Sequence, residues 1–272
     1  MAKVITTINE DILSKKICFI PTMGAIHEGH LSLVDLGKET NLNTLVSIFL
    51  NRKQFNNTED FINYPSELEQ DIQILESSGV DYIFLPEESY IYPSQGVPTV
   101  LPGKVGGILE GLSRPGHFEG VLTVVNRLFD LVQPSHAVFG KKDAQQLFLI
   151  KNMINEFDLN IKIIEGEIFR DENGLALSSR NKHLSPAAKL NASNIFSNLL
   201  YVANEINSGK DFKESVELGS NLINQNEIKL DYLDLVDEEN FKYPNKYSRK
   251  LKLLIAAYVE DIRLIDNIDI KI

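Results

Sequence analysis

The sequence predicts an α/β fold, with a parallel sheet in the first part of the chain and a smaller α+β domain after it. Short apolar runs alternate with segments whose apolar residues recur at helical spacing, which is typical of a parallel sheet flanked by helices. The chain has 272 residues, enough for two domains of ordinary size, and its pattern changes near Ile168. We therefore predict one domain over residues 1–168 and a second over residues 169–272.

The strands of the first domain are expected where short apolar runs occur, at residues 17–20, 45–50, 82–85, 137–139 and 161–164. Between them, apolar residues recur at helical spacing, as at Leu68, Ile72 and Leu75 and again along residues 121–132, and we interpret these stripes as core. Residues 90–111 combine prolines and glycines with short apolar pieces, so we expect an irregular excursion from the sheet there.

The second domain is expected to begin with helices and to end with strands. Helical patterns cover residues 186–206 and 212–223, and apolar runs follow at residues 230–236, 251–259 and 262–265. Ser185 stands directly before Pro186, so we predict that its side chain caps the first of these helices.

Composition narrows the class of protein. Hydrophobic residues make up 43% of the chain and charged residues 24%, as in soluble globular proteins, and no apolar stretch approaches the roughly 20 residues that span a bilayer. A net charge of −11 argues against broad binding to nucleic acid or to an anionic membrane. The first residues lack the apolar core of a signal peptide, so we expect a cytoplasmic protein. Cys18, the only cysteine, lies in an apolar run and is interpreted as a core residue.

Two histidines stand where the first expected strand gives way to a helix. In the segment Pro-Thr-Met-Gly-Ala-Ile-His-Glu-Gly-His, which spans residues 21–30, His27 and His30 are three positions apart. A helix N-terminus favours anions, glycines such as Gly24 and Gly29 permit close approach to the backbone, and imidazoles can donate to phosphate oxygens. The segment therefore predicts a phosphate site. The alternative is that both histidines are ordinary polar loop residues.

Polar residues also follow two further expected strands. In an open parallel sheet, ligands bind beyond the carboxyl ends of the strands. Gly140 permits close approach there, a lysine two residues on can neutralise a phosphate, and Asp143 can accept from ribose hydroxyls or orient a cation. Gln54 and Gln146 carry a donor and an acceptor together, which suits the hydroxyl and carboxylate groups of a small substrate. For either glutamine alone, a capping or surface role is the alternative.

A third polar segment lies near the predicted domain boundary. Ser178, Ser179 and Arg180 bring two hydroxyls and a guanidinium together, a set that can stabilise negative charge as pyrophosphate departs. The alternative is that the two serines form a turn or cap a helix.

These motifs together resemble those of the pantothenate synthetase, or pantoate–β-alanine ligase, family. They occur in family order between residues 21 and 181, whereas the C-terminal third is similar in length and pattern more than in motif. The matching segments are Pro21–Gly24 with His30–Leu33, Asn51 with Gln54–Phe55, Ser113–Phe118 with Gly120–Val121, Phe139–Gly140 with Lys142–Asp143 and Gln145–Leu147, and Gly174–Ala176 with Ser178–Asn181.

The resemblance implies a Rossmann-like, doubly wound sheet of the nucleotidylyltransferase superfamily, with a C-terminal domain that closes over the active site. It also implies that pantoate attacks the α-phosphate of ATP to form pantoyl adenylate and pyrophosphate, after which β-alanine displaces AMP. Catalysis then consists of positioning and charge stabilisation, with no covalent nucleophile. Mg²⁺ is expected to arrive with ATP, and a homodimer is implied.

Site residues follow from the resemblance position by position. Catalytic roles are implied for His27, His30, Lys142, Ser178, Ser179 and Arg180. ATP binding is implied for these six and for Pro21, Thr22, Met23, Gly24, Gly29, Gly140 and Asp143. Pantoate is expected to contact Met23, Asn51, Gln54, Phe55, Val121 and Gln146. Asp71 is nominated as a metal ligand.

Four positions depart from the family pattern. Arg52 replaces a usual proline, Ser66 an arginine and Leu177 a methionine, while Lys141 stands where an acid is common. Because Lys141 and Lys142 are adjacent, the choice of Lys142 as phosphate ligand rests on the family register. Two other classes stay open: a nucleotidylyltransferase that acts on another cofactor precursor, which would need a second cationic site, and a non-catalytic nucleotide-binding protein.

Overall fold

The computed structural model describes residues 2–65, 67–224 and 227–272, and it divides into two compact units. The first unit contains the chain through Lys141 and then Gln145–Glu167. The second contains Lys142–Ala144 and Ile168–Ile272. The second unit thus resumes at Ile168, where the sequence pattern changes. It includes four residues that the sequence places in the first domain, Lys142–Ala144 and Ile168. Ser66, one of the four departures, lies outside the described residues.

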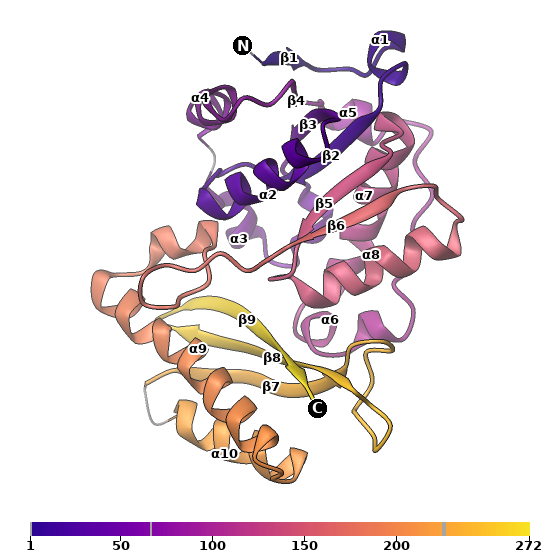
Figure 1. Ribbon diagram of the computed structural model, residues 1–272. Helices are drawn as coiled ribbons and strands as arrows, with labels where there is room; N and C mark the ends of the chain where they lie inside the picture. Colours follow the sequence, from indigo (N-terminus) through magenta and orange to yellow (C-terminus); the bar gives the residue numbers. More distant parts are fainter. Residues whose placement is uncertain (1, 66, 225–226) are drawn as a thin grey trace. The chain divides into compact units, whose positions relative to one another are not determined.

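The first unit is built on a six-stranded sheet in which every paired strand is parallel (Figure 1). The strand order is β1-β4-β3-β2-β5-β6. The chain winds outward from β2 in one direction through β3 and β4, and then in the other through β5 and β6, so the sheet is doubly wound as predicted. The strands are β1 (Lys3–Ile5), β2 (Ile17–Thr22), β3 (Asn43–Ile48), β4 (Tyr82–Phe84), β5 (His136–Gly140) and β6 (Lys162–Gly166).

Five of these strands coincide with the predicted apolar runs, and for β2, β3, β4 and β5 the reason is burial on both faces. Phe19 packs in one core cluster with Leu122 and Phe129, whereas its neighbour Cys18 packs in another with Val34. Strands covered on both faces read as continuous apolar runs. Cys18 is a fully buried core residue, as predicted.

Helices and short helical turns connect the strands of the first unit. Residues 92–104 contain neither helix nor strand, in agreement with the predicted excursion. The elements are α1 (Glu10–Leu13), α2 (Glu28–Glu39), η1 (Arg52–Gln54), α3 (Thr58–Ile62), α4 (Leu68–Ser78), α5 (Glu88–Ile91), η2 (Val105–Gly107), α6 (Glu110–Ser113), α7 (His117–Val132) and α8 (Ala144–Glu156).

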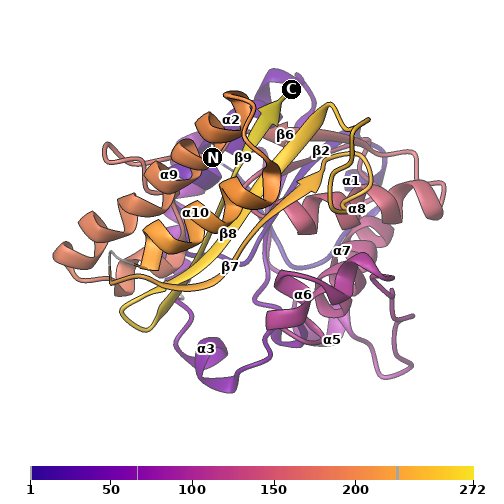
Figure 2. The ribbon, with the colours of Figure 1, turned by 90° about the horizontal axis from the view of Figure 1, so that it is seen from below.

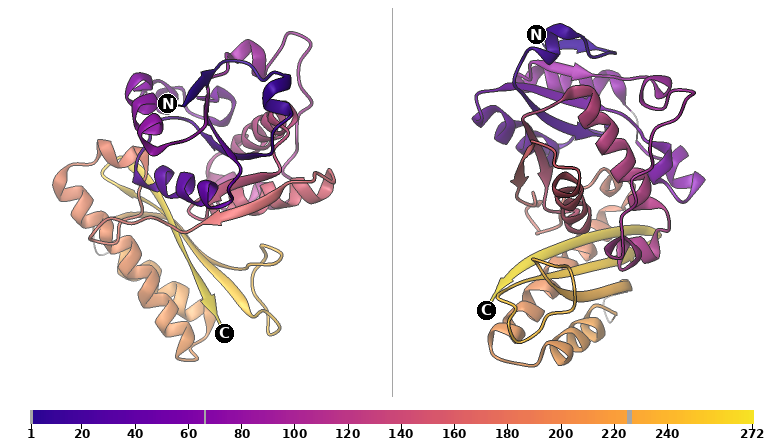
Figure 3. Two further views of the ribbon diagram at one scale, coloured as in Figure 1. Left: turned by 45° about the horizontal axis from the view of Figure 1, so that its top comes forward. Right: turned by 90° about the vertical axis from the view of Figure 1, so that its right-hand side faces the viewer.

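The second unit is an antiparallel sheet in the order β7-β8-β9 with two helices on one face (Figures 2 and 3). Its core joins Ile195 and Leu199 of the first helix to Leu253 and Ile255 of the central strand. The Ser185 side chain accepts from the backbone N–H of Ala188 at 3.1 Å, which confirms the predicted cap. The elements are η3 (Ser179–His183), α9 (Pro186–Asn207), α10 (Phe212–Asn224), β7 (Lys229–Asp237), β8 (Lys250–Val259) and β9 (Ile262–Lys271).

Candidate active site

The histidine turn, residues 21–30, connects β2 to α2 through left-handed backbone. Gly24 has φ 87° and Ala25 has φ 52°, and α2 then begins with His27 as its N-cap. Nδ1 of His27 accepts from the N–H of Gly29 at 3.1 Å, and Nδ1 of His30 accepts from the N–H of His27 at 3.4 Å. A neutral imidazole that accepts at Nδ1 carries its hydrogen at Nε2. Both rings, with centroids 4.1 Å apart, therefore have a donor at Nε2, as phosphate oxygens require.

Three other residues of this segment, Pro21, Thr22 and Gly29, are expected to bind ATP, and Thr22 also stabilises the backbone of the turn. The Thr22 hydroxyl donates to the carbonyl of Ser47 at 2.7 Å and accepts from the N–H of Gly24 at 3.3 Å. Pro21 belongs to β2 itself, and Gly29 lies in the first turn of α2. The turn thus stands at the carboxyl end of β2, next to the point where the winding of the sheet reverses.

The side chain of Asp71, in α4, holds the backbone of the histidine turn in place. Its carboxylate is only 3% exposed, and it accepts from the N–H groups of Ala25 at 2.8 Å and Ile26 at 2.7 Å. A Cβ at Gly24 would lie 2.8 Å from Asp71 Oδ2, so this position requires glycine for space as well as for its positive φ. Both carboxylate oxygens thus have backbone donors. Among the described residues, no group of three side chains suited to hold a metal ion occurs, and the role of Asp71 as a metal ligand stays a prediction.

The end of β3 brings three of the expected pantoate residues together. Asn51 and Gln54 are 1% and 8% exposed. Asn51 Nδ2 donates to Gln54 Oε1 at 3.0 Å, and Gln54 Nε2 donates to Met23 Sδ at 2.8 Å. Met23 belongs to the histidine turn, so the side-chain amides of Asn51 and Gln54 lie directly beside the turn within the first unit.

The remaining pantoate residues are less closely connected. Val121 is buried in the core of the first unit, and Phe55 makes edge contacts with Phe61 and Tyr64 at centroid distances of 5.4 and 5.7 Å. Gln146 lies half-buried on α8. The hydrogen bonds that the described residues make do not join Gln146 to Gln54, so its role in the site stays a prediction.

The motif Ser113–Phe118 supports Gln54 from the backbone side. His117 Nδ1 donates to the carbonyl of Gln54 at 2.8 Å, since a carbonyl can only accept. His117 Nε2 then accepts from Arg114 at 3.1 Å, and Arg114 lies 3.8 Å from Glu110. The sequence resemblance contains this motif without giving its residues a role, and the structure shows that it fixes the end of η1.

The two adjacent lysines have different partners. Lys141 forms an ion pair with Glu167 and its N–H donates to the carbonyl of Gly166 at 2.8 Å, both within the first unit. Lys142 is paired more loosely, with Asp143, at 3.9 Å between Nζ and Oδ2. This difference favours Lys142 as the lysine available to a phosphate.

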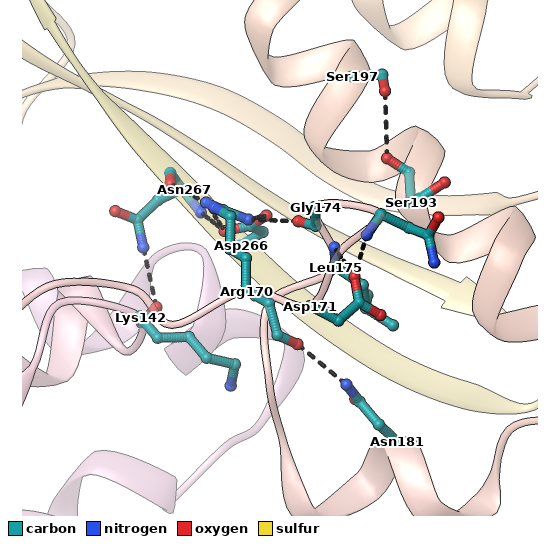
Figure 4. A network of polar contacts seen from close by, with 12 residues as sticks. Lys142, Arg170, Asp171, Gly174, Leu175, Asn181, Ser193, Ser197, Asp266 and Asn267 are labelled. Carbon is teal, nitrogen blue, oxygen red and sulfur yellow. Dashed lines mark hydrogen bonds and ion pairs between the residues drawn. The ribbon is translucent and has the colours of Figure 1, made fainter. Parts of the chain in front are cut away.

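A polar network in the second unit supports Lys142 (Figure 4). Nδ2 of Asn267, a residue of β9 that is 1% exposed, donates to the Lys142 carbonyl at 2.9 Å. The preceding residue, Asp266, is paired with Arg170 at 2.5 and 2.8 Å. Burial raises the pKa of Asp266, while Arg170 acts in the opposite direction. Arg170 also donates to the carbonyl of Gly174, so β9 is connected to the segment that leads to Ser178.

The segment Ser178–Arg180 forms the start of η3. The Ser178 hydroxyl accepts from the N–H of Arg180 at 3.3 Å, so the capping role considered for this serine is present. Ser179 is buried and Arg180 is half-buried. Asn181 fastens the segment, because its Nδ2 donates to the carbonyl of Ala176 at 3.1 Å.

Arg52 and Leu177, two positions that depart from the family pattern, both have partners in the structure. The Arg52 guanidinium lies over the Phe61 ring, 5.5 Å from its centroid, and the N–H of Leu177 donates to the carbonyl of Phe169.

A doubly wound sheet whose first long strand turns into a donor-bearing helix N-terminus is the arrangement of α/β proteins that bind phosphate groups. The class defined by fold and site is therefore a nucleotide-using α/β enzyme. The chain belongs to the pantoate–β-alanine ligase family, whose model matches residues 1–269.

Relatives and solved structures agree with this family. The pantothenate synthetase of Thermosipho africanus is 41% identical over 266 residues, which cover 96% of this chain and 95% of the relative. That of Pseudothermotoga lettingae is 43% identical over 258 residues, or 93% and 91% of the two chains. The crystal structure of pantothenate synthetase from Thermus thermophilus has a TM-score of 0.92 at 35% identity and covers 98% of each chain.

A second structure carries ligands. Pantoate–β-alanine ligase from Francisella tularensis, described as complexed with β,γ-ATP and β-alanine, has a TM-score of 0.82 at 38% identity and covers 98% of this chain and 97% of its own. Among the described residues, no helix is long and apolar enough to span a membrane.

Proposed function

We propose that this chain condenses pantoate with β-alanine in an ATP-dependent reaction that passes through pantoyl adenylate. A pantoate carboxylate oxygen attacks the α-phosphorus, the bond to the bridging oxygen breaks, and pyrophosphate leaves. The β-alanine amine then attacks the acyl carbon, the bond to AMP breaks, and a proton is released as the amide forms. The family supports this reaction over transfer of AMP to another cofactor precursor.

The observation that carries the proposal is that two kinds of hydrogen-bond donor, imidazole and side-chain amide, lie next to each other in the first unit. The tautomers of His27 and His30 have Nε2–H groups suited to phosphate oxygens, and the neighbouring cluster of Met23, Asn51 and Gln54 offers an amide beside an apolar thioether. The first set suits ATP and the second a small acid with apolar parts, such as pantoate. Lys142, Ser178, Ser179 and Arg180 would add positive charge and hydroxyl donors to the phosphates.

Mg²⁺ would enter mainly as a ligand of the ATP phosphates. The described residues do not offer a cage of protein carboxylates for it, and Asp71 is already bonded to two backbone N–H groups. We therefore assign the protein no step that passes through the metal. A homodimer in the cytoplasm is part of the same proposal.

The test is release of AMP and pyrophosphate with ATP and each combination of pantoate and β-alanine. Adenylate and pyrophosphate should form with ATP and pantoate alone, while continuous AMP release should require β-alanine as well. Pantoate-dependent cleavage of ATP to ADP and inorganic phosphate would contradict the scheme, because it indicates an acyl phosphate.

Variants of the two glutamines test the acid site separately. An unpaired buried polar group costs about 1–3 kcal/mol, so Gln54→Ala and Gln146→Ala should each raise the pantoate requirement by roughly tenfold to a hundredfold. ATP affinity should change little, as should β-alanine attack on preformed pantoyl adenylate. Gln73→Ala, at an exposed position of α4, is the control. Unchanged pantoate dependence in both glutamine variants would place the acid elsewhere.

A further inference from the structure

Tyr92 lies directly after α5, outside every motif of the family resemblance, and its hydroxyl donates to Asn51 Oδ1 at 2.9 Å. The Nζ of Lys53 lies 4.0 Å from the centroid of the Tyr92 ring, which holds the ring in place. Burial raises the pKa of Tyr92 to about 12, with Glu88 adding to the rise and the bond to Asn51 opposing it. The hydroxyl therefore keeps its hydrogen at any ordinary working pH, and it acts as a donor.

The side-chain amide of Asn51 uses its full hydrogen-bonding capacity. Oδ1 accepts from the Tyr92 hydroxyl and, at 3.3 Å, from the N–H of Lys53. Nδ2 donates to Gln54 Oε1 and, at 3.1 Å, to the carbonyl of Gly120. An amide has two lone pairs on oxygen and two hydrogens on nitrogen, so all four are used. In the reversed orientation, the oxygen would face two other oxygens, at Gln54 and Gly120.

This fixed amide decides which atom of Gln54 points to a ligand. Because Gln54 Oε1 is held by Asn51, the nitrogen Nε2 is turned to the other side, where Met23 Sδ lies. Thioether sulfur is a weak acceptor, and Nε2 carries a second hydrogen. Gln54 therefore offers a donor, which suits a carboxylate or hydroxyl oxygen and not a ligand that must donate.

We propose that Tyr92 is a positioning residue, which fixes Asn51 and through it holds Gln54 with its amide nitrogen toward the acid substrate. The proposal rests on the proposed function, in which Gln54 contacts pantoate. Tyr92 itself is not a catalytic residue, because it acts only through the side chain of Asn51.

The first test is Tyr92→Phe, which removes the hydroxyl and keeps the ring over Lys53. We call the series of hydrogen bonds from Tyr92 through Asn51 to Gln54 the relay. Loss of its first bond should raise KM for pantoate by about threefold to tenfold, while KM for ATP and kcat stay within about twofold. Tyr90→Phe is the matched control, because the Tyr90 hydroxyl accepts from the N–H of Ile8 and takes no part in the relay. Asn51→Asp should have a larger effect, since a carboxylate cannot donate to Gln54 Oε1.

A double-mutant cycle separates positioning from a general loss of structure. If Tyr92 acts through Gln54, then Tyr92→Phe has no further effect on KM for pantoate in a Gln54→Ala background. Additive effects of the two changes, or an equal rise in KM for ATP, would overturn the proposal. A normal effect of Gln54→Ala with none of Tyr92→Phe would overturn it while the proposed function stands. Absence of any pantoate-dependent AMP release in the unaltered protein would instead refute the function.

Discussion

Replacing Asp71 by asparagine tests whether the histidine turn is held in place by a carboxylate. The two oxygens of Asp71 accept from Ala25 and Ile26 at 2.8 and 2.7 Å in a site that is 3% exposed. Hydrogen bonds to a charged group contribute about 1.5–3 kcal/mol each. Asparagine keeps one acceptor and turns an N–H₂ group toward the second backbone donor, so the free energy of unfolding should fall by about 1.5–3 kcal/mol.

Activity should fall more than stability alone explains. Ala25 has φ 52°, a conformation that costs a non-glycine residue roughly 1–2 kcal/mol, so the turn relaxes when one of its two bonds is lost. His27 and His30 would then no longer hold their Nε2 donors in register, and we expect kcat to fall by about tenfold to a hundredfold. Asp71→Ala is less informative, because two buried N–H groups without partners can prevent folding.

The assay is steady-state AMP release, combined with urea unfolding of the same samples. Asp81→Asn is the control: Asp81 Oδ2 accepts from the N–H of Thr44 at 2.7 Å. This bond lies at the amino ends of β3 and β4, whereas the histidine turn lies at the carboxyl end of β2. This control should lose stability but keep kcat within about twofold. A stability loss in Asp71→Asn without a loss of kcat would refute the reasoning. Recovery of kcat on raising Mg²⁺ would indicate that Asp71 binds the metal, whereas no recovery would indicate that its carboxylate acts through the turn alone.

Three further predictions concern other parts of the chain. Lys142→Ala should lower kcat by roughly 10²–10³ with a smaller change in ATP affinity, whereas Lys141→Ala should change kcat little. Steady-state kinetics of both variants is the measurement, and the reverse result would show that Lys141 is the phosphate ligand. Asn267→Ala should lower the single-turnover rate of pyrophosphate release by about tenfold, because the Lys142 carbonyl loses its donor at 2.9 Å, and an unchanged rate would contradict this. Cys18 is 0% exposed, and burial raises the pKa of its thiol. It should therefore react with a thiol reagent only after unfolding in urea, and prompt labelling of the folded protein would show the core to be open.

The fold could be predicted from sequence to the extent that burial leaves a local pattern. Strands covered on both faces appear as apolar runs, which is why residues 17–20 were sufficient to locate β2. The missed strand, β1, has three residues, begins with Lys3, and lies at the edge of the sheet with two exposed positions. Such a strand differs little from a loop in sequence, since it buries almost nothing.

In the candidate site too, local features could be predicted from sequence and long-range contacts could not. The histidine turn was predictable because its glycines and histidines are neighbours in sequence. Its supports were not, since each acts at a distance: Asp71 is 45 residues from Ile26, Tyr92 is 41 from Asn51, and Asn267 is 125 from Lys142. A single sequence holds no local signal for such pairs. Gln145 belongs to a matching segment but received no role for the same reason, although it is 2% exposed and its amide binds the backbone of Glu110, Val105 and Ile108.

The assignment of Lys142–Ala144 to the second unit means that the chain passes from one unit to the other three times, after Lys141, after Ala144 and after Glu167. A fragment that ends at Ile168, the last residue of the first domain predicted from sequence, would contain Lys142 but not Asn267. Dividing the gene there would therefore separate Lys142, the proposed phosphate ligand, from the strand whose Asn267 binds its carbonyl. We therefore expect limited proteolysis or fragment complementation to show that activity requires β9, the last strand of the chain.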